Sequence, residues 1–262
     1  MTTPLLRVED VKVHFGGVKA VDGVSLELAE GRLFGLVGPN GSGKSTLLGA
    51  LSRMTALTNG RLWFAGHNYE RDTPQQVSRR GLGRTFQTVR LLPALSVLEN
   101  VMIGADSRLY GQRITPNWVM PWRTRRLEVA CRQAAIEAIE RLGIADLMNR
   151  PSGVLPYGTQ RRVEIARILA AEPKLMLFDE PAAGMNHQER DAIAQVMRQL
   201  QAEGMTQILV EHDMQMISDV CEHVLVMNFG KVIAAGTAQS VVRDPEVQEA
   251  YLGKRGTGHA AA

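Results

Sequence analysis

Short apolar runs separated by turn residues recur along the chain, and most of them have the length of strands. Alternating apolar and polar positions over 5–15 and 24–28 predict two antiparallel strands on either side of Gly16 and Gly17. Further strands are predicted by short runs bounded by turn residues; these cover 33–37, 60–66 (an edge strand), 175–180, 206–210 and 224–236, the last a pair that turns at Gly230.

Helical patterns alternate with these runs, and they dominate between residues 107 and 156. Pro156 fits a helix start because proline is favoured in the first turn, and Gly143 fits a helix end. A loop marked by Pro116, Trp118, Pro121 and Trp122 precedes the longest of these helices. The helical patterns cover 46–51, 97–102, 124–142, 156–171, 187–203 and 245–252. The chain is therefore predicted to be an α/β protein with a helical insertion.

Length and composition suit one sizeable α/β domain or a core with a subdomain, since the 262 residues are 45% hydrophobic and 22% charged. A formal charge of +3 on a chain this long is too mild to imply a nucleic acid partner. Arginines cluster at 79/80/84, 123/125/126 and 161/162, and we interpret such clusters as solvated faces.

The two cysteines, Cys131 and Cys221, are far apart and lack C-x-x-C spacing, so we expect buried thiols in a reducing compartment. No apolar run reaches the ~18 residues of a membrane helix. Charged residues close behind the N-terminus argue against a signal peptide. These features predict a soluble cytoplasmic protein that meets a membrane only through a partner.

The segment 38–46 lies between a strand pattern and a helical pattern and fits the phosphate-binding pattern G-x-x-x-x-G-K-[ST]. Gly41 and Gly43 let the backbone curl so that N–H groups point at phosphate oxygens. Lys44 supplies a positive charge to the phosphates, Ser45 offers a hydroxyl to Mg²⁺, and the following helix turns its positive end toward the anion. The pattern predicts a nucleoside triphosphate site formed by Gly38, Pro39, Asn40, Gly41, Ser42, Gly43, Lys44, Ser45 and Thr46.

Several other residues fit this chemistry, although each has a plainer alternative. Asp179 and Glu180 end an apolar run, which places them at the carboxyl edge of a parallel sheet, where one can hold Mg²⁺ and the other can face a water. Two solvated acids ending a strand are the alternative. Gln87 taken alone indicates a polar residue at a strand end, and Phe15 fits either the core or stacking on a base. His212 alone among the six histidines follows a predicted core strand.

The phosphate loop, Gln87, a glycine at 158 before a helix, Asp179 with Glu180, and His212 occur in this order. Over residues 5–252 the chain thereby resembles the nucleotide-binding subunit of an ABC transporter. The resemblance implies a P-loop NTPase (ABC ATPase) core with an antiparallel β subdomain and an inserted α-helical subdomain. Within a single domain of residues 1–262, the implied parts are the core over 5–87 and 157–238, the helical subdomain over 88–156, and a C-terminal helix and tail over 239–262.

In that family two subunits dimerise head to tail, and each ATP is held between one phosphate loop and the other subunit's signature helix. The resemblance implies that Phe15 stacks on adenine and that Ser45, Gln87 and Asp179 surround Mg²⁺. Glu180 becomes the general base or water-positioning residue, and His212 contacts the γ-phosphate. The implied catalytic residues are Lys44, Gln87, Glu180 and His212, and the implied signature residues are Tyr157, Gly158 and Thr159.

The signature departs from the family's usual Leu-Ser-Gly-Gly-Gln, because this chain has Leu-Pro-Tyr-Gly-Thr at 155–159. The serine hydroxyl that reaches the γ-phosphate is absent, and Thr159 or the N–H groups near Gly158 are the candidate replacements. Asn186 stands where Asp is usual.

One subgroup has these features, the ATPase subunits of branched-chain amino acid importers. The similar segments are 15–17, 84–87, 90–91, 157–158, 180–184, 211–214 and 250–253. The implied partners are two integral membrane permeases, a second ATPase subunit and, indirectly, an extracytoplasmic solute-binding protein, with the chain at the inner face of the membrane.

Other functions remain open at this stage. Related ATPases serve urea or other small solutes, and a similar ATPase that shares the Tyr-Leu-Gly ending exports lipid-linked material. Soluble ABC ATPases that act on DNA carry long coiled-coil insertions, and those that act on ribosomes usually have two cassettes in one chain. This chain has one cassette and a short insertion, which favours the importer.

Overall fold

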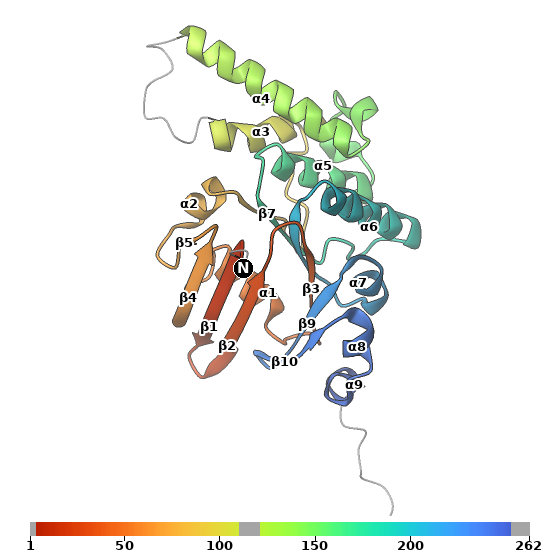
Figure 1. Cartoon of the computed structure of the whole chain (residues 1–262). Helices are drawn as coiled ribbons and strands as arrows, with labels where there is room; N and C mark the ends of the chain where they lie inside the picture. The colour runs from red at the N-terminus through yellow and green to blue at the C-terminus, as the bar shows by residue number, and fades with distance from the viewer. Residues whose placement is uncertain (1–3, 110–120, 253–262) are drawn as a thin grey trace, which may run out of the picture. The chain divides into compact units, whose positions relative to one another are not determined.

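The structure, a computed structural model, describes residues 4–109 and 121–252. The chain forms two compact units, which we call the first unit (residues 1–73 and 200–262) and the second unit (residues 74–199). Figure 1 shows the elements of each. The subdomain limits predicted from the sequence stay a prediction.

An antiparallel sheet opens the first unit. Its strand order is β2 (Val18–Leu28), β1 (Leu6–Phe15), β4 (Asn59–Phe64) and β5 (His67–Asn68). Alternate positions of β1 are buried, as the period-two pattern predicts. The prediction that 60–66 forms an edge strand was wrong, because β5 pairs with the outer side of β4. With two residues, β5 is too short to leave a hydrophobic pattern.

The first unit also contains four strands in the order β10, β9, β3 and β8. In this arrangement β3 (Leu33–Val37) pairs in parallel with β8 (Thr206–Val210) and β9 (His223–Asn228), and β10 (Lys231–Gly236) returns antiparallel to β9. The predicted turn at Gly230 is confirmed, with φ 78°. The helices of this unit are α1 (Lys44–Leu51), α7 (Met214–Val220), α8 (Ala238–Val242) and α9 (Pro245–Leu252).

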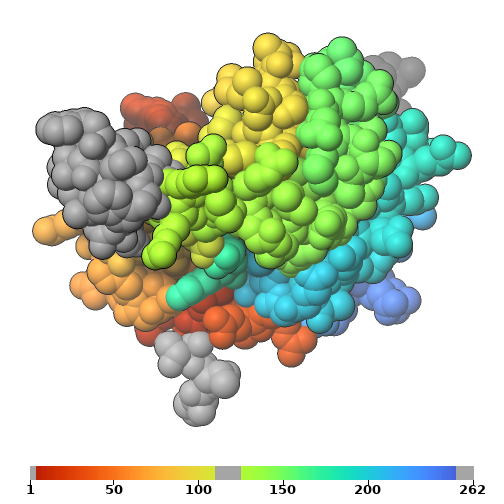
Figure 2. Space-filling model, turned by 90° about the horizontal axis from the view of Figure 1, so that it is seen from above, coloured from red at the N-terminus to blue at the C-terminus, as the bar shows by residue number. Residues whose placement is uncertain are grey.

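The second unit is mostly helical around one parallel pair of strands, β6 (Leu82–Arg84) and β7 (Leu175–Asp179). Its helices are α2 (Pro74–Arg79), α3 (Val97–Leu109), α4 (Pro121–Arg141), α5 (Tyr157–Leu169) and α6 (His187–Ala202). Helix α3 packs against α4 and α5, and Figure 2 shows the yellow atoms of α3 beside the green atoms of α4.

Helix α4 begins at Pro121, so the prediction that Pro121 and Trp122 belong to a loop was wrong. Proline is compatible with the first helical position because its missing N–H has no partner to lose there. Pro116 and Trp118 lie outside the described residues, as do the predicted tail from Gly253 onward and His259.

Both cysteines are buried, as predicted. Burial raises the pKa of the Cys221 thiol, and an added Cβ at Gly35 would lie 3.2 Å from its sulfur, so this thiol packs directly on β3. Within 4–109 and 121–252 the structure contains no helix that is both long enough and apolar enough to span a bilayer.

Candidate nucleotide site

The phosphate loop joins β3 to α1, and its backbone adopts conformations that favour glycine. Gly38, Gly41 and Gly43 have φ values of 148°, 79° and 104°. An added Cβ at Gly38 would lie 2.1 Å from the Met227 carbonyl oxygen, and one at Gly43 would lie 2.1 Å from that of Ala20. Side chains at Gly38 and Gly43 are therefore excluded both by φ and by space, and at Gly41 they are disfavoured by φ alone. The loop forms the glycine-lined cradle that a phosphate group requires.

Lys44 is the first residue of α1, and its side chain is buried inside the loop. Its Nζ donates to the carbonyl oxygens of Gly38 at 2.7 Å and Pro39 at 2.9 Å, and lies 3.4 Å from Ser42 Oγ. The loop thus curls around the ammonium group. The α1 terminus has no side-chain cap, so an anion held there meets first-turn N–H groups as well as the lysine charge.

Strand pairing brings His212 to the same sheet edge as the phosphate loop. In the parallel pair of β3 and β8, Leu36 lies opposite Val210, so residues 38 and 212 both follow the carboxyl ends of adjacent strands. The His212 side chain is 56% exposed, with Nδ1 3.7 Å from Glu211 Oε2. Asp213 then caps α7, accepting from the Gln215 N–H at 2.9 Å. These contacts fix the position of His212 between the end of β8 and the start of α7.

Phe15 ends β1 and its side chain is 56% exposed. The alternative that Phe15 belongs to the core is therefore wrong. An exposed ring at a hairpin end is available for stacking on a base, and that role stays a prediction.

The C-terminal helix lies against the phosphate loop. A cavity of about 520 Å³ is lined by Pro39, Asn40, Gly41 and Ser42 on one side and by Glu246, Glu249 and Ala250 of α9 on the other, with Asn228 and Phe229 between them. The Tyr251 hydroxyl contacts the Gly38 backbone and lies 3.8 Å from Met214 Sδ. Burial raises the pKa of Tyr251, and the Gly38 contact partly opposes that shift.

In the second unit, Gln87, Asp179 and Glu180 gather at one edge of the β6–β7 pair. Arg84 lies opposite Leu177, and the Asp179 N–H donates to Thr85 Oγ1 at 3.2 Å. Gln87 lies beyond the end of β6, and its Nε2 donates to Glu180 Oε2 at 3.2 Å. The amide and the carboxylate, which the family resemblance placed in one set of catalytic residues, are therefore in contact.

Arg84 is a residue of this edge that sequence reasoning missed as a functional group. Its Nη2 lies 2.9 Å from Asp179 Oδ2, with both side chains largely buried. The guanidinium and the carboxylate therefore form an ion pair at this edge. Glu180, the next residue, has φ 46°, an uncommon conformation outside glycine and one that tends to occur at functional positions.

Tyr157, Gly158 and Thr159 form the first turn of α5, as predicted. Thr159 is 9% exposed, so little of its side chain is accessible to a ligand outside the helix. Gly158 packs on Glu189, from which an added Cβ would lie 3.0 Å. Asn186 caps α6, because its Oδ1 accepts from the Glu189 N–H at 3.0 Å.

The interpretation of arginine clusters as solvated faces was wrong for Arg161, which is fully buried at 0% exposure, and for Arg84, whose side chain is 12% exposed. A signal for the burial of Arg161 was present in the sequence, because Glu164 lies one turn further along among apolar positions. Burial of an arginine requires such a partner, and the two are joined at 2.6 Å.

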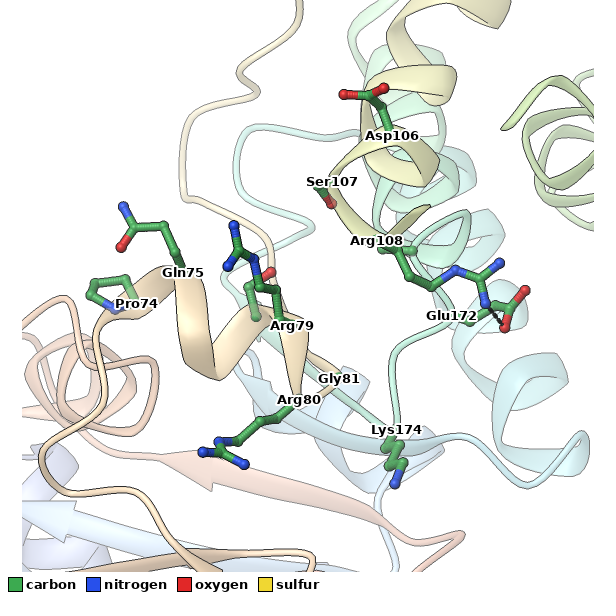
Figure 3. A pocket seen from close by; sticks show the side chains of 12 residues that line it. Pro74, Gln75, Arg79, Arg80, Gly81, Asp106, Ser107, Arg108, Glu172 and Lys174 are labelled. Carbon is green, nitrogen blue, oxygen red and sulfur yellow. Dashed lines mark hydrogen bonds and ion pairs between the residues drawn. The ribbon is translucent and has the colours of Figure 1, made fainter. Parts of the chain in front are cut away.

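Another cavity of about 570 Å³ lies in the second unit between α2 and α3 (Figure 3). Arg79, Arg80 and Lys174 line it, together with Arg108, which pairs with Glu172. Of the residues predicted to bind nucleotide or metal, none is among those described as lining it.

Comparison with known proteins places these features in a family. The model of the ABC transporter family matches residues 21–183, and that of the branched-chain amino acid ATP-binding cassette transporter matches residues 231–257. The second match covers β10 and α9, and α9 lines the cavity beside the phosphate loop.

Two curated relatives match nearly end to end. The high-affinity branched-chain amino acid transport ATP-binding protein BraF of Pseudomonas aeruginosa is 34% identical, over 97% of this chain and 100% of the relative. The protein of the same description named LivG in Salmonella typhimurium is 36% identical, with the same coverage. A crystal structure of an ATP-binding cassette of an ABC transporter in its ADP conformation superposes with a TM-score of 0.83, at 32% identity and coverage of 97% and 100%. The chain is thus a member of the ABC transporter family of ATP-binding subunits, in the branched-chain amino acid group.

Proposed function

We propose that this chain binds and hydrolyses ATP to energise an importer of branched-chain or other hydrophobic amino acids. The observation that carries the proposal is the phosphate loop, in which left-handed glycines and the buried Lys44 form an anion cradle. The relatives named above carry ATP-binding and branched-chain amino acid transport in their descriptions, and this chain spans their full length.

The first unit contributes the groups that hold the nucleotide. Lys44 neutralises charge on the β- and γ-phosphates, and the N–H groups of the loop bind phosphate oxygens. Phe15 stacks on adenine with its exposed ring, and His212 contacts the γ-phosphate from the edge of β8. Ser45, directly after Lys44, supplies a hydroxyl oxygen for Mg²⁺.

The second unit contributes the groups for the hydrolytic step. The amide oxygen of Gln87 and the carboxylate of Asp179 are oxygen donors of the kind that Mg²⁺ prefers, so the donor set fits this ion. Bound Mg²⁺ neutralises charge that develops on the phosphates. Glu180 positions and deprotonates the attacking water, and the Gln87 Nε2 contact holds that carboxylate in place.

The importer is assembled from this chain, a second ATPase subunit placed head to tail, two membrane permeases and an extracytoplasmic solute-binding protein. The start of α5 then meets the ATP held by the partner subunit. Because Thr159 is buried while Tyr157 is 39% exposed, the N–H groups at the start of α5 are better candidates than the Thr159 hydroxyl to bind the γ-phosphate there. The chain acts at the inner face of the membrane.

Uptake measurements test this proposal. A strain with this gene disrupted is complemented with the wild-type chain or with Lys44→Ala, and uptake of labelled leucine and labelled urea is compared. We expect the wild-type chain to restore leucine uptake and the Lys44→Ala chain not to restore it. If the wild-type chain restores urea uptake but not leucine uptake, the transported solute is urea and not a branched-chain amino acid. If the Lys44→Ala chain restores as much uptake as the wild-type chain, ATP-driven import is contradicted.

A further inference from the structure

Arg161 lies in the first turns of α5 with its guanidinium completely enclosed. Its Nη1 donates to the Phe86 carbonyl oxygen at 2.6 Å and to Glu164 Oε2 at 2.6 Å. Its Nη2 donates to the Gln87 carbonyl oxygen at 2.8 Å and to the Tyr157 hydroxyl at 3.1 Å. One planar group therefore joins the start of α5 to the backbone of the segment that carries Gln87.

These contacts continue to the proposed catalytic carboxylate. The guanidinium fixes both carbonyls flanking the Gln87 backbone, and the Gln87 side chain donates to Glu180 Oε2 at 3.2 Å. At the other end, Arg161 donates to the Tyr157 hydroxyl. Tyr157 is 39% exposed and lies at the start of α5, the helix end proposed to meet the partner's nucleotide. The path from Tyr157 through Arg161 to Glu180 lies entirely within the second unit.

A role as a simple buried ion pair would leave most of this arrangement unexplained. Pairing with Glu164 requires one guanidinium nitrogen, yet three of the four acceptors lie elsewhere. A lysine could neutralise Glu164 equally well, but an ammonium on a flexible stem cannot span acceptors arranged as a planar fork. The geometry specifically requires arginine.

We infer that Arg161 is a positioning residue for ATP hydrolysis. It ties the backbone at Gln87 to Tyr157 at the start of α5, and it thereby holds the Gln87 side chain against Glu180. The inference rests on the proposed roles of Gln87 and Glu180. It adds a fixed connection, within one subunit, between the helix end that meets the partner's ATP and the groups that act on the subunit's own ATP.

The test compares Arg161→Lys with wild type in the full chain assembled with its transporter partners. Lysine keeps the charge opposite Glu164, so we expect the variant to fold and its Kd for ATP to stay within about twofold of the control's. We expect kcat to fall about tenfold at unchanged KM, since misplacement of a catalytic group acts on the chemical step. The matched control is Arg198→Lys, at an exposed position of α6.

Two further measurements separate positioning from general stability. In a Gln87→Ala background, which keeps the backbone carbonyl, Arg161→Lys should cause no additional fall in kcat, because both changes act through one side chain. Without nucleotide, trypsin should cleave after Arg90 several-fold faster in Arg161→Lys, because the tether on residues 86 and 87 is weakened. The inference would be overturned if Arg161→Lys lowered kcat by the same factor with Gln87 present and in the Gln87→Ala background. A wild-type kcat in Arg161→Lys would overturn it too.

If Arg161→Lys does not fold, Tyr157→Phe decides. It removes only the hydroxyl that accepts from Nη2, at a partly exposed position, and we expect kcat to fall about threefold at unchanged Kd. A kcat equal to wild type in Tyr157→Phe would overturn the inference. Failure of the proposed function looks different, since the wild-type assembly would then show no ATP hydrolysis to perturb.

Discussion

Arg84 Nη2 lies 2.9 Å from Asp179 Oδ2, with side-chain exposures of 12% and 7%. A cation is thus paired with the carboxylate proposed to ligate Mg²⁺, and it competes with that ion for the same oxygen. Arg84→Gln removes the competing charge, so we expect the Mg²⁺ concentration for half-maximal ATP hydrolysis to fall about fivefold. The free energy of unfolding should also fall by about 2 kcal/mol, because a largely buried carboxylate loses its partner.

The control for this variant is Arg79→Gln, on the exposed end of α2. It removes the same charge from the same unit without touching Asp179, so it corrects for a general change in net charge. A higher Mg²⁺ requirement in Arg84→Gln than in Arg79→Gln would mean that Arg84 supports the metal site instead of competing for it.

Lys44→Ala should abolish measurable ATP binding, with a Kd raised at least about 100-fold. The ammonium is both the cation for the phosphates and the centre of the loop, because Gly38 and Pro39 accept from it. Binding of a fluorescent ATP analogue measures the effect, with the exposed Lys19→Ala as the control. Full binding by Lys44→Ala would contradict the phosphate assignment.

Glu180→Gln should keep ATP binding and lose hydrolysis by at least about 100-fold, because an amide cannot accept the proton of the attacking water. The change preserves size, and both side chains meet the same strain at φ 46°. We expect the ATP-bound dimer to accumulate, which light scattering with and without ATP can measure. Glu140→Gln, exposed on α4, is the control, and unchanged turnover in Glu180→Gln would remove this residue from the mechanism.

Strands and helices that carry their own hydrophobic period were predictable. Strand β8 and helix α9 have the predicted limits, and α6 ends one residue before the predicted end. Short elements were not: α2, α7, α8 and β5 carry too few residues to establish a period, and α7 depends on the Asp213 cap.

The candidate site was predictable where the chemistry is encoded in contiguous residues. The phosphate loop is such a case, because its glycines and Lys44 act through one short segment. Arg84 and Arg161 were not, because their roles depend on acceptors distant in sequence: Asp179 for the first, and the carbonyls of residues 86 and 87 for the second. Charge clustering alone suggests a solvated surface, whereas the packed structure encloses Arg161 fully and buries most of the Arg84 side chain.

The approach of α3 to α5 provides a test of the fold that is independent of nucleotide. An added Cβ at Gly104 would lie 1.8 Å from the Arg167 carbonyl oxygen, a backbone atom that cannot move away cheaply. Alanine gains about 1 kcal/mol in helix propensity, but overpacking costs about 3 kcal/mol. We therefore expect Gly104→Ala to lower the free energy of unfolding in urea by about 2 kcal/mol. Gly17→Ala is the control, since its added Cβ meets nothing within 4 Å, and a gain in stability for Gly104→Ala would exclude this helix contact.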